Sequence, residues 1–123
     1  MINIWVVLGI ILIHWFADFV LQTDKQAKGK SKNWSDLLSH TIDYSVVWFY
    51  ISILYISSNG LNPILLFFAP ITFVFHTITD YFTSRLNSKL WEQGKIHNLF
   101  VSIGFDQVLH YVQLFLTYYL LTM

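Results

Sequence analysis

The feature that most constrains the fold of this chain is a succession of four long apolar stretches within only 123 residues. A helix of about 20 mainly apolar residues is long enough to cross the bilayer core of about 30 Å. Charged residues make up 11% of the chain, too few to cover the surface of a water-soluble domain, which has roughly 25%. The sequence therefore predicts an all-α integral membrane protein, a four-transmembrane-helix bundle with short loops, in one domain over residues 1–123. The predicted spans are about residues 2–22, 36–57, 63–86 and 98–121.

The connectors between these spans differ in charge. All seven basic residues lie in the first and third connectors or at their edges, and the second connector has none. By the positive-inside rule, the first and third connectors face the cytoplasm and both termini lie on the non-cytoplasmic side. The start of the chain lacks the basic region and the small-residue cleavage site of a signal peptide, so the first span is expected to be retained.

Two local features refine this picture. Residues 86–98 mix charged and apolar side chains and predict an amphipathic interfacial segment on the membrane surface. Pro70, inside the third span, predicts a bend there, because proline removes a backbone hydrogen bond from a helix.

Charge and cysteine content exclude several classes of function. The formal net charge is zero, so no long-range field favours a nucleic-acid partner. Cysteine is absent, which excludes disulfides, thiolate zinc sites and cysteine nucleophiles.

Each predicted span carries one histidine and one aspartate, although ionisable residues are rare in membrane helices. The two members of a pair are three or four positions apart, which places both side chains on one helix face. At a rise of about 1.5 Å per residue, all four pairs fall in the cytoplasmic half of the bilayer, although alternate spans run in opposite directions. The pairs are His14 with Asp18, His40 with Asp43, His76 with Asp80, and Asp106 with His110.

The aspartates indicate a metal centre, because a charged aspartate at a helix centre disfavours membrane insertion by roughly 2.5–3.5 kcal/mol. Apart from Arg85 at a span end, no lysine or arginine lies within the spans to pair with them. Facing helices of di-metal bundles supply carboxylate and imidazole ligands of this kind. All eight residues are therefore predicted ligands of a divalent metal, about two zinc, manganese or iron ions per chain. Asp43 is the residue for which we most expect an exception, since its spacing of three differs from the others. Interhelical hydrogen bonding is the alternative role for any one pair.

Four motifs in order carry a family resemblance: His14-Trp-Phe-Ala-Asp18, His40-Thr-Ile-Asp43, His76-Thr-Ile-Thr-Asp80 and Asp106-Gln-Val-Leu-His110. Together they resemble a small bacterial and phage membrane protein family catalogued as domain of unknown function 3307. The resemblance covers nearly the whole chain and implies a location in the bacterial inner (cytoplasmic) membrane, but no activity. More loosely, the spans with His-x-x-x-Asp are similar to those of inner-membrane metal-dependent hydrolases, which is a likeness of pattern alone.

The leading functional hypothesis is metal-dependent hydrolysis at the cytoplasmic leaflet, on a phosphoester or lipid-linked substrate. A metal ion activates water near neutral pH, and Asp18 or Asp106 could transfer the proton as a catalytic carboxylate. Arg85 and Lys25 are expected to bind a phosphate, with Gln22 and Gln107 extending the polar stripe around the site. The lipid bilayer is the expected partner.

Three other functions stay open. The same residues could form the path of an ion or proton transporter or channel, although the outer half of the first span is wholly apolar. A bis-histidine haem protein would explain the histidines but not an aspartate beside each one. A structural or lytic phage membrane protein would need neither the histidines nor the aspartates. The sequence also leaves open whether two copies pair as a homodimer.

Overall fold

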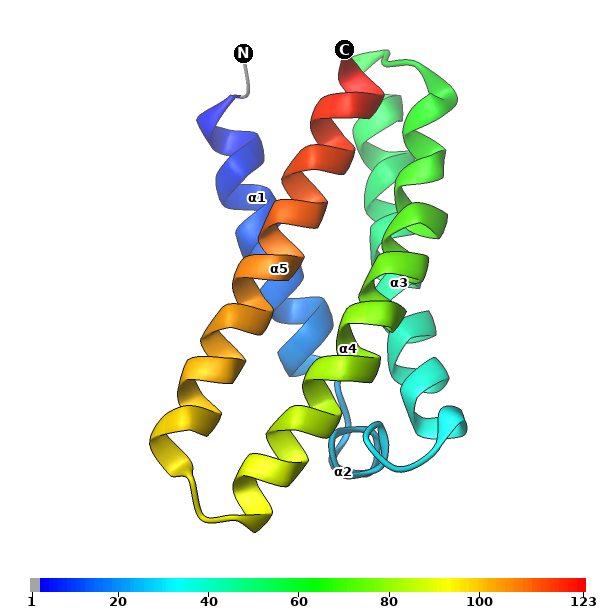
Figure 1. The fold of residues 1–123 in the computed structure, drawn as a ribbon. Coiled ribbons are helices and arrows are strands. Elements are labelled where there is room, and N and C mark those ends of the chain that lie inside the picture. Colours follow the sequence, from blue (N-terminus) through cyan, green and yellow to red (C-terminus); the bar gives the residue numbers. More distant parts are fainter. Residues whose placement is uncertain (1–2) are drawn as a thin grey trace.

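The computed structural model describes residues 3–123, and the elements within that range are all helical (Figure 1). Met1 and Ile2, where the predicted first span begins, lie outside the described residues. The all-α prediction is confirmed. In chain order the elements are α1 (Ile4–Trp15), the π-helical turn η1 (Phe16–Val20), α2 (Asp24–Gly29), α3 (Trp34–Asn59), the 3-10 helix η2 (Pro63–Phe67), α4 (Phe68–Glu92) and α5 (Ile96–Thr122).

Within residues 3–123, three helical segments, not the predicted four, are long and apolar enough to cross a membrane: Trp34–Asn59, Pro63–Glu92 and Ile96–Thr122. The first apolar helix, Ile4–Val20, is shorter because a capping box begins a new helix soon after it. The Thr23 side chain accepts a hydrogen bond from the backbone N–H of Gln26, and the Gln26 side chain accepts one from the backbone N–H of Thr23.

The third connector is much shorter than predicted. α4 continues to Glu92 and α5 begins at Ile96, so residues 86–98 form no separate interfacial segment. Gly94 makes the turn with a φ of 68°, in the left-handed region that glycine adopts at little cost. Polar side chains of the two helices bond to each other near this turn, with Ser102 Oγ donating to Asn87 Oδ1 at 2.6 Å.

Pro70 does not interrupt a regular helix. It lies in the first turn of α4, directly after η2. The first backbone N–H groups of a helix have no intrahelical partner, so proline removes no hydrogen bond there. The irregularity expected within the third span thus takes the form of a 3-10 start.

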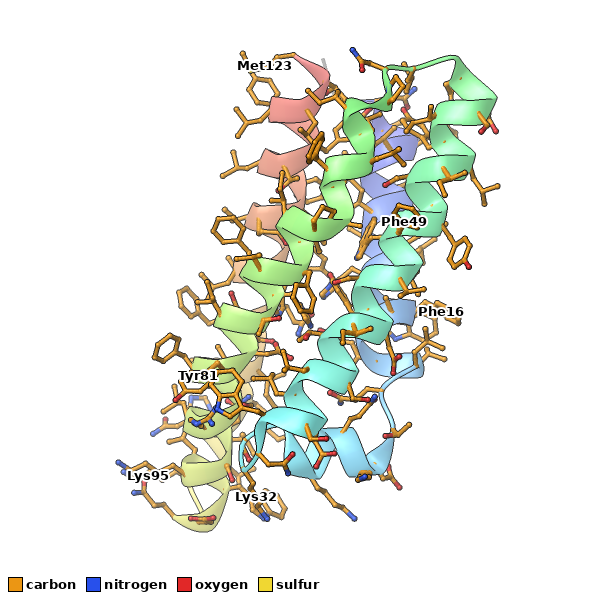
Figure 2. All side chains as sticks on the ribbon, turned by 90° about the vertical axis from the view of Figure 1, so that its right-hand side faces the viewer. Phe16, Lys32, Phe49, Tyr81, Lys95 and Met123 are labelled. Atoms are coloured by element: carbon orange, nitrogen blue, oxygen red, sulfur yellow. The ribbon has the colours of Figure 1, made fainter. Side chains whose placement is uncertain are left out.

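The helices pack side by side with their ends sorted by charge. α4 packs along both α3 and α5, and α1 packs against α5. The start of α1 and the end of α5 lie at one end, here called the terminal end (Figure 1). The opposite end, here called the basic end, consists of residues 24–33 and the turn between α4 and α5. Figure 2 shows Lys32 and Lys95 there.

The interior is more polar than the surface. Large apolar side chains such as Trp5, Phe82 and Phe100 are at least 65% exposed, and many others project outward along the helices (Figure 2). The buried set includes histidines, aspartates, threonines and serines. A surface this apolar suits a lipid environment and would be a large association patch in water.

A close approach between Gly29 and Asp36 forms the corner between α2 and α3. A Cβ at Gly29 would overlap the Asp36 carboxylate. That carboxylate accepts a 2.8 Å hydrogen bond from Asn33 Nδ2, and the backbone N–H of Asp36 donates to Asn33 Oδ1 at 2.8 Å. The corner therefore requires glycine at position 29 for space, not for backbone conformation.

We expect Gly29→Ala to lower the free energy of unfolding by about 1–3 kcal/mol, the usual cost of overpacking. Thermal unfolding in detergent, followed by circular dichroism, measures this. Gly104→Ala is the matched control, because a Cβ added at that position would meet no atom of another residue within 4 Å beyond its own helix backbone and chain neighbours. Equal midpoints for the two variants would contradict the proposed corner.

Candidate metal centre

Every predicted ligand except Asp43 lies in one buried cluster between the helices. Each of these side chains belongs to a residue at most 8% exposed. α1 and η1 contribute one pair, α3 one histidine, and α4 and α5 one pair each. The members of the cluster are His14, Asp18, His40, His76, Asp80, Asp106 and His110.

Four members offer ligand atoms that all lie within 4.8 Å of one another: Asp18, His40, His76 and Asp80. Asp18 Oδ1 lies 3.0 Å from His40 Nε2 and 3.4 Å from His76 Nε2. Asp80 Oδ2 lies 3.3 and 3.5 Å from the same two nitrogens, which are 3.2 Å apart. Ligand atoms about 2.0–2.1 Å from a tetrahedral ion are separated by about 3.3–3.4 Å. Five of the six separations among these two oxygens and two nitrogens therefore lie near those of a tetrahedral metal site.

A second group lies beside the first and shares one residue with it. Asp18, Asp106 and His110 also bring ligand atoms within 4.8 Å of one another. His110 Nε2 lies 3.3 Å from Asp106 Oδ2 and 3.2 Å from Asp80 Oδ1. His110 thus connects the second group to Asp80, while Asp18 belongs to both groups.

The π-helical turn η1 directs Asp18 into the cluster. The backbone N–H of Leu21 donates to the Phe16 carbonyl at 3.0 Å, one residue further back than in an α-helix. This wider turn lets the adjacent residues Ala17 and Asp18 both be buried, at 1% and 5% exposed. Single π-helical turns occur frequently at functional sites.

His14 uses both ring nitrogens in hydrogen bonds to side chains outside the two ligand groups. A carboxylate can only accept, so Gln107 directs its NH₂ to Asp106 Oδ2 at 3.1 Å and its carbonyl oxygen to His14 Nε2 at 2.6 Å. The His14 Nε2 atom therefore donates, and Nδ1 accepts from the Tyr44 hydroxyl at 2.7 Å. This arrangement favours a role for His14 in orienting the cluster.

Tyr44 is a member of the site that sequence analysis did not predict. Its ring stacks on His76, with centroids 3.8 Å apart and planes 5° from parallel. Its hydroxyl bonds His14, so one side chain positions two histidines. Tyr44 follows His40 by four residues, and this helical spacing was the signal available in the sequence.

Asp43 lies outside the cluster and is exposed. Its Oδ2 accepts a 2.8 Å hydrogen bond from Gln26 Nε2, on α2. The buried face of α3 contains His40, Thr41 and Tyr44, and a spacing of three from His40 carries Asp43 to the edge of that face. Asp43 therefore supports the packing of α2 and is not placed to hold a metal with the other seven.

Lys30 is the second residue that sequence analysis missed, because it was assigned to the polar connector alone. Its Nζ lies 3.0 Å from Asp80 Oδ2, and its side chain is only 19% exposed. Burial by itself lowers the pKa of the Lys30 ammonium, but the carboxylates of Asp80, Asp18 and Asp106 outweigh this and raise the pKa above its ordinary value. Lys30 thus supplies one lasting positive charge to the cluster.

The four predicted substrate-binding residues are dispersed. Lys25 is 84% exposed and lies 3.9 Å from Asp36. Arg85 donates to the Tyr81 carbonyl at 2.9 Å and lies 3.6 Å above the Tyr81 ring, away from the cluster. Gln107 bonds two cluster members, as described above. The Oε1 atom of Gln22 is buried without a hydrogen-bond partner in the described part of the chain.

In protein stripped of metal by a chelator, we expect Lys30→Met to lower the free energy of unfolding by roughly 3–5 kcal/mol, because Asp80 loses its cationic partner. Adding Asp80→Asn should restore most of that loss, since the unpaired charge is then removed. Lys28→Met, which removes an exposed charge from the same turn, is the control and should change little. Thermal unfolding of the single and double variants in detergent tests this, and additive effects of Lys30→Met and Asp80→Asn would contradict the pairing.

Comparison with known proteins identifies a family but no activity. Neither the curated proteins nor the solved structures yield a match to this chain. The model of one family matches residues 6–123, essentially the whole chain, in agreement with the resemblance of the four motifs. The chain therefore belongs to the family described as Protein of unknown function (DUF3307).

Proposed function

We propose that this protein is a membrane-embedded, metal-dependent hydrolase whose metal centre is the buried His/Asp cluster. The observation that carries the proposal is that His40 Nε2 and His76 Nε2 lie 3.2 Å apart and 3.0–3.5 Å from both Asp18 Oδ1 and Asp80 Oδ2. Two imidazole nitrogens and two carboxylate oxygens at tetrahedral spacing suit zinc better than octahedral manganese or iron.

The proposed topology has four crossings in the bacterial inner membrane, with the basic end in the cytoplasm. The segment Ile4–Val20 reaches about 25 Å at a helical rise of about 1.5 Å per residue. A shortfall of this size is accommodated by local thinning of the bilayer at modest cost. The start of α1 and the end of α5 lie at the same end (Figure 1), as an even number of crossings requires.

The charge of the cluster favours one divalent ion, where the sequence predicted two. Three carboxylates are buried together, those of Asp18, Asp80 and Asp106. Lys30 neutralises one negative charge, and one divalent ion neutralises the other two. The prediction of two ions depended on a fourth carboxylate, Asp43, and took no account of Lys30.

Groups beyond the four ligands support a catalytic role over a structural one. A structural metal ion needs four ligands only, whereas this cluster also contains His14, Asp106 and His110, and Lys30 contacts it from outside. When bound, a divalent ion supplies Lewis acidity and makes water a better nucleophile. Asp106 is then the proposed general base, because its Oδ1 is buried without a hydrogen-bond partner among the described residues. Asp18 belongs to both ligand groups and is less free to accept a proton.

A cation path is the second candidate function, favoured by a polar network on the terminal side of the cluster. Gln113 Nε2 donates to Thr72 Oγ1 at 3.1 Å and to Thr117 Oγ1 at 2.9 Å. However, a buried apolar layer that includes Trp48, Phe68 and Leu114 lies on the same side. A cavity of about 350 Å³ borders this layer, but its walls include the apolar side chains of Ile10, Trp48 and Phe68. Apolar walls disfavour the passage of a cation, which favours the hydrolase.

The positions of the histidine nitrogens argue against the haem alternative. His40 and His76 bring their Nε2 atoms within 3.2 Å of each other, which leaves no room for a porphyrin between them. Aspartates lie against both nitrogens, whereas a haem face needs apolar neighbours.

Mass spectrometry of detergent-purified protein should find about one zinc per chain. We expect Asp80→Asn to lose it, because one of four ligands is removed. Asp43→Asn makes the same chemical change outside the cluster and should retain it. No metal in the wild-type chain after reconstitution would overturn the proposal, and two ions per chain would overturn the charge argument.

Asp106→Asn should retain the metal but lower the turnover of a phosphoester such as p-nitrophenyl phosphate by about 10²–10⁴-fold, the usual contribution of a general base. Metal content and turnover are measured on the same preparation, with Asp43→Asn as the control. If the wild-type protein hydrolyses neither phosphomonoesters nor phosphodiesters but carries zinc into liposomes, the cation path replaces the hydrolase.

A further inference from the structure

A cavity at the basic end lies next to the metal cluster but belongs to neither ligand group. It measures about 370 Å³ and is lined by residues 27–32, except Gly29, on one side and by the last turns of α4 on the other. This volume is within the range of small-molecule sites, about 300–1,000 Å³, and accommodates a phosphate together with part of the group attached to it.

The lining of this cavity is basic and rich in hydrogen-bond donors. Lys28, Lys30 and Lys32 all contribute, and Glu92 is the one acidic residue among the lining residues. Positive charge remains even after Glu92 offsets one lysine and Asp80 shares the charge of Lys30. Ser31, Ser84 and Ser88 add hydroxyl groups. Lysine ammonium groups and hydroxyls are common phosphate-binding groups.

Ser84 provides the second, independent observation. It is 6% exposed, and its Oγ is buried without a hydrogen-bond partner within residues 3–123. Serine hydroxyls within helices commonly bond the carbonyl four residues back, as Ser45 and Ser52 do on α3. Ser84 lines the cavity and its hydroxyl makes no such bond, so a rotation of the side chain would let the hydroxyl bond a ligand there.

Lys30 joins the cavity to the cluster. Its side chain lines the cavity and its Nζ contacts Asp80 at 3.0 Å. Ser84 follows Asp80 by one helical turn, so the face of α4 that carries Asp80 continues into the cavity wall. A group that contacts Lys30 in the cavity is therefore separated from Asp80, a proposed metal ligand, by one side chain.

We propose that this cavity is an anion subsite that binds a phosphate group through Ser84 and the three lysines. The assignment of this phosphate to the substrate rests on the proposed hydrolase function. The binding of an anion in the cavity does not depend on that function. The phosphate comes either from a lipid headgroup or from a soluble phosphoester, two sources with the same chemistry at this site.

Titration of the detergent-purified chain with inorganic phosphate, followed by calorimetry, tests the subsite. It is done on the protein as purified and after chelation, so that binding to a metal ion is separated from binding to the cavity. We expect saturable binding in both preparations. Ser84→Ala should weaken binding about tenfold, the effect of one hydrogen bond to a charged group, and Lys32→Gln should weaken it severalfold.

Lys89→Gln is the matched control, because it removes an exposed lysine charge from α4 outside the cavity and should leave phosphate binding unchanged. Absence of phosphate binding, or equal affinities for Ser84→Ala and Lys89→Gln, would overturn the subsite. Binding that persists in chelated protein while the wild-type chain contains no metal would retain the subsite and reject the hydrolase.

Nanodiscs distinguish the two sources of the phosphate. Discs of phosphatidylcholine alone are compared with discs that also contain phosphatidic acid, whose headgroup is a phosphate monoester. Loss of inorganic phosphate binding only in the phosphatidic acid discs would support the subsite with a lipid headgroup as its ligand. Equal binding in both discs would support it with a soluble phosphoester.

Discussion

The structure depends on the burial of three carboxylates inside a helical bundle whose outer surface is apolar. A carboxylate taken out of water is costly unless it is paired and hydrogen-bonded. Here Asp18 lies against His40 and Asp80 against His110, each from another helix, while Asp106 lies against His110 one turn along its own helix. Lys30 reaches Asp80 at 3.0 Å. The acids of η1 and α4 therefore depend on partners that neighbouring helices present. This requirement explains why the polar faces of α1, α3, α4 and α5 all point to one place.

The contacts that pair these carboxylates also hold the helices together. In lipid, apolar side chains give little preference for another helix over the surrounding chains, so packing and polar contacts decide which faces meet. The His/Asp contacts connect η1 with α3, α3 with α4, and α4 with α5. Tyr44 adds aromatic packing to these contacts, because it stacks on His76 while its hydroxyl bonds His14. The cluster is thus both the candidate metal centre and the polar core of the fold.

The two ends of the bundle differ in the side chains that lie beyond the cluster. Toward the terminal end, the apolar side chains of Ile10, Trp48, Phe68 and Leu114 pack together beyond the cluster. Toward the basic end, Lys30 and Ser84 lie between the cluster and a cavity with hydroxyl and ammonium groups. A substrate phosphate in that cavity would reach the cluster without crossing the apolar layer.

The sequence by itself determined the helical fold, the membrane-like composition and most of the cluster, because apolar length and an i, i+4 spacing are local properties of a helix. It also determined the family, through four motifs that extend over nearly the whole chain. Only the tertiary structure decided that Asp43 faces Gln26, that Lys30 belongs to the site and that His14 bonds Tyr44 and Gln107. The first two depend on how α2 and its C-cap fold back against α3 and α4, and the third depends on how α1 meets α3 and α5. Such contacts leave no periodic pattern, since their partners are 17 to 93 positions apart along the chain.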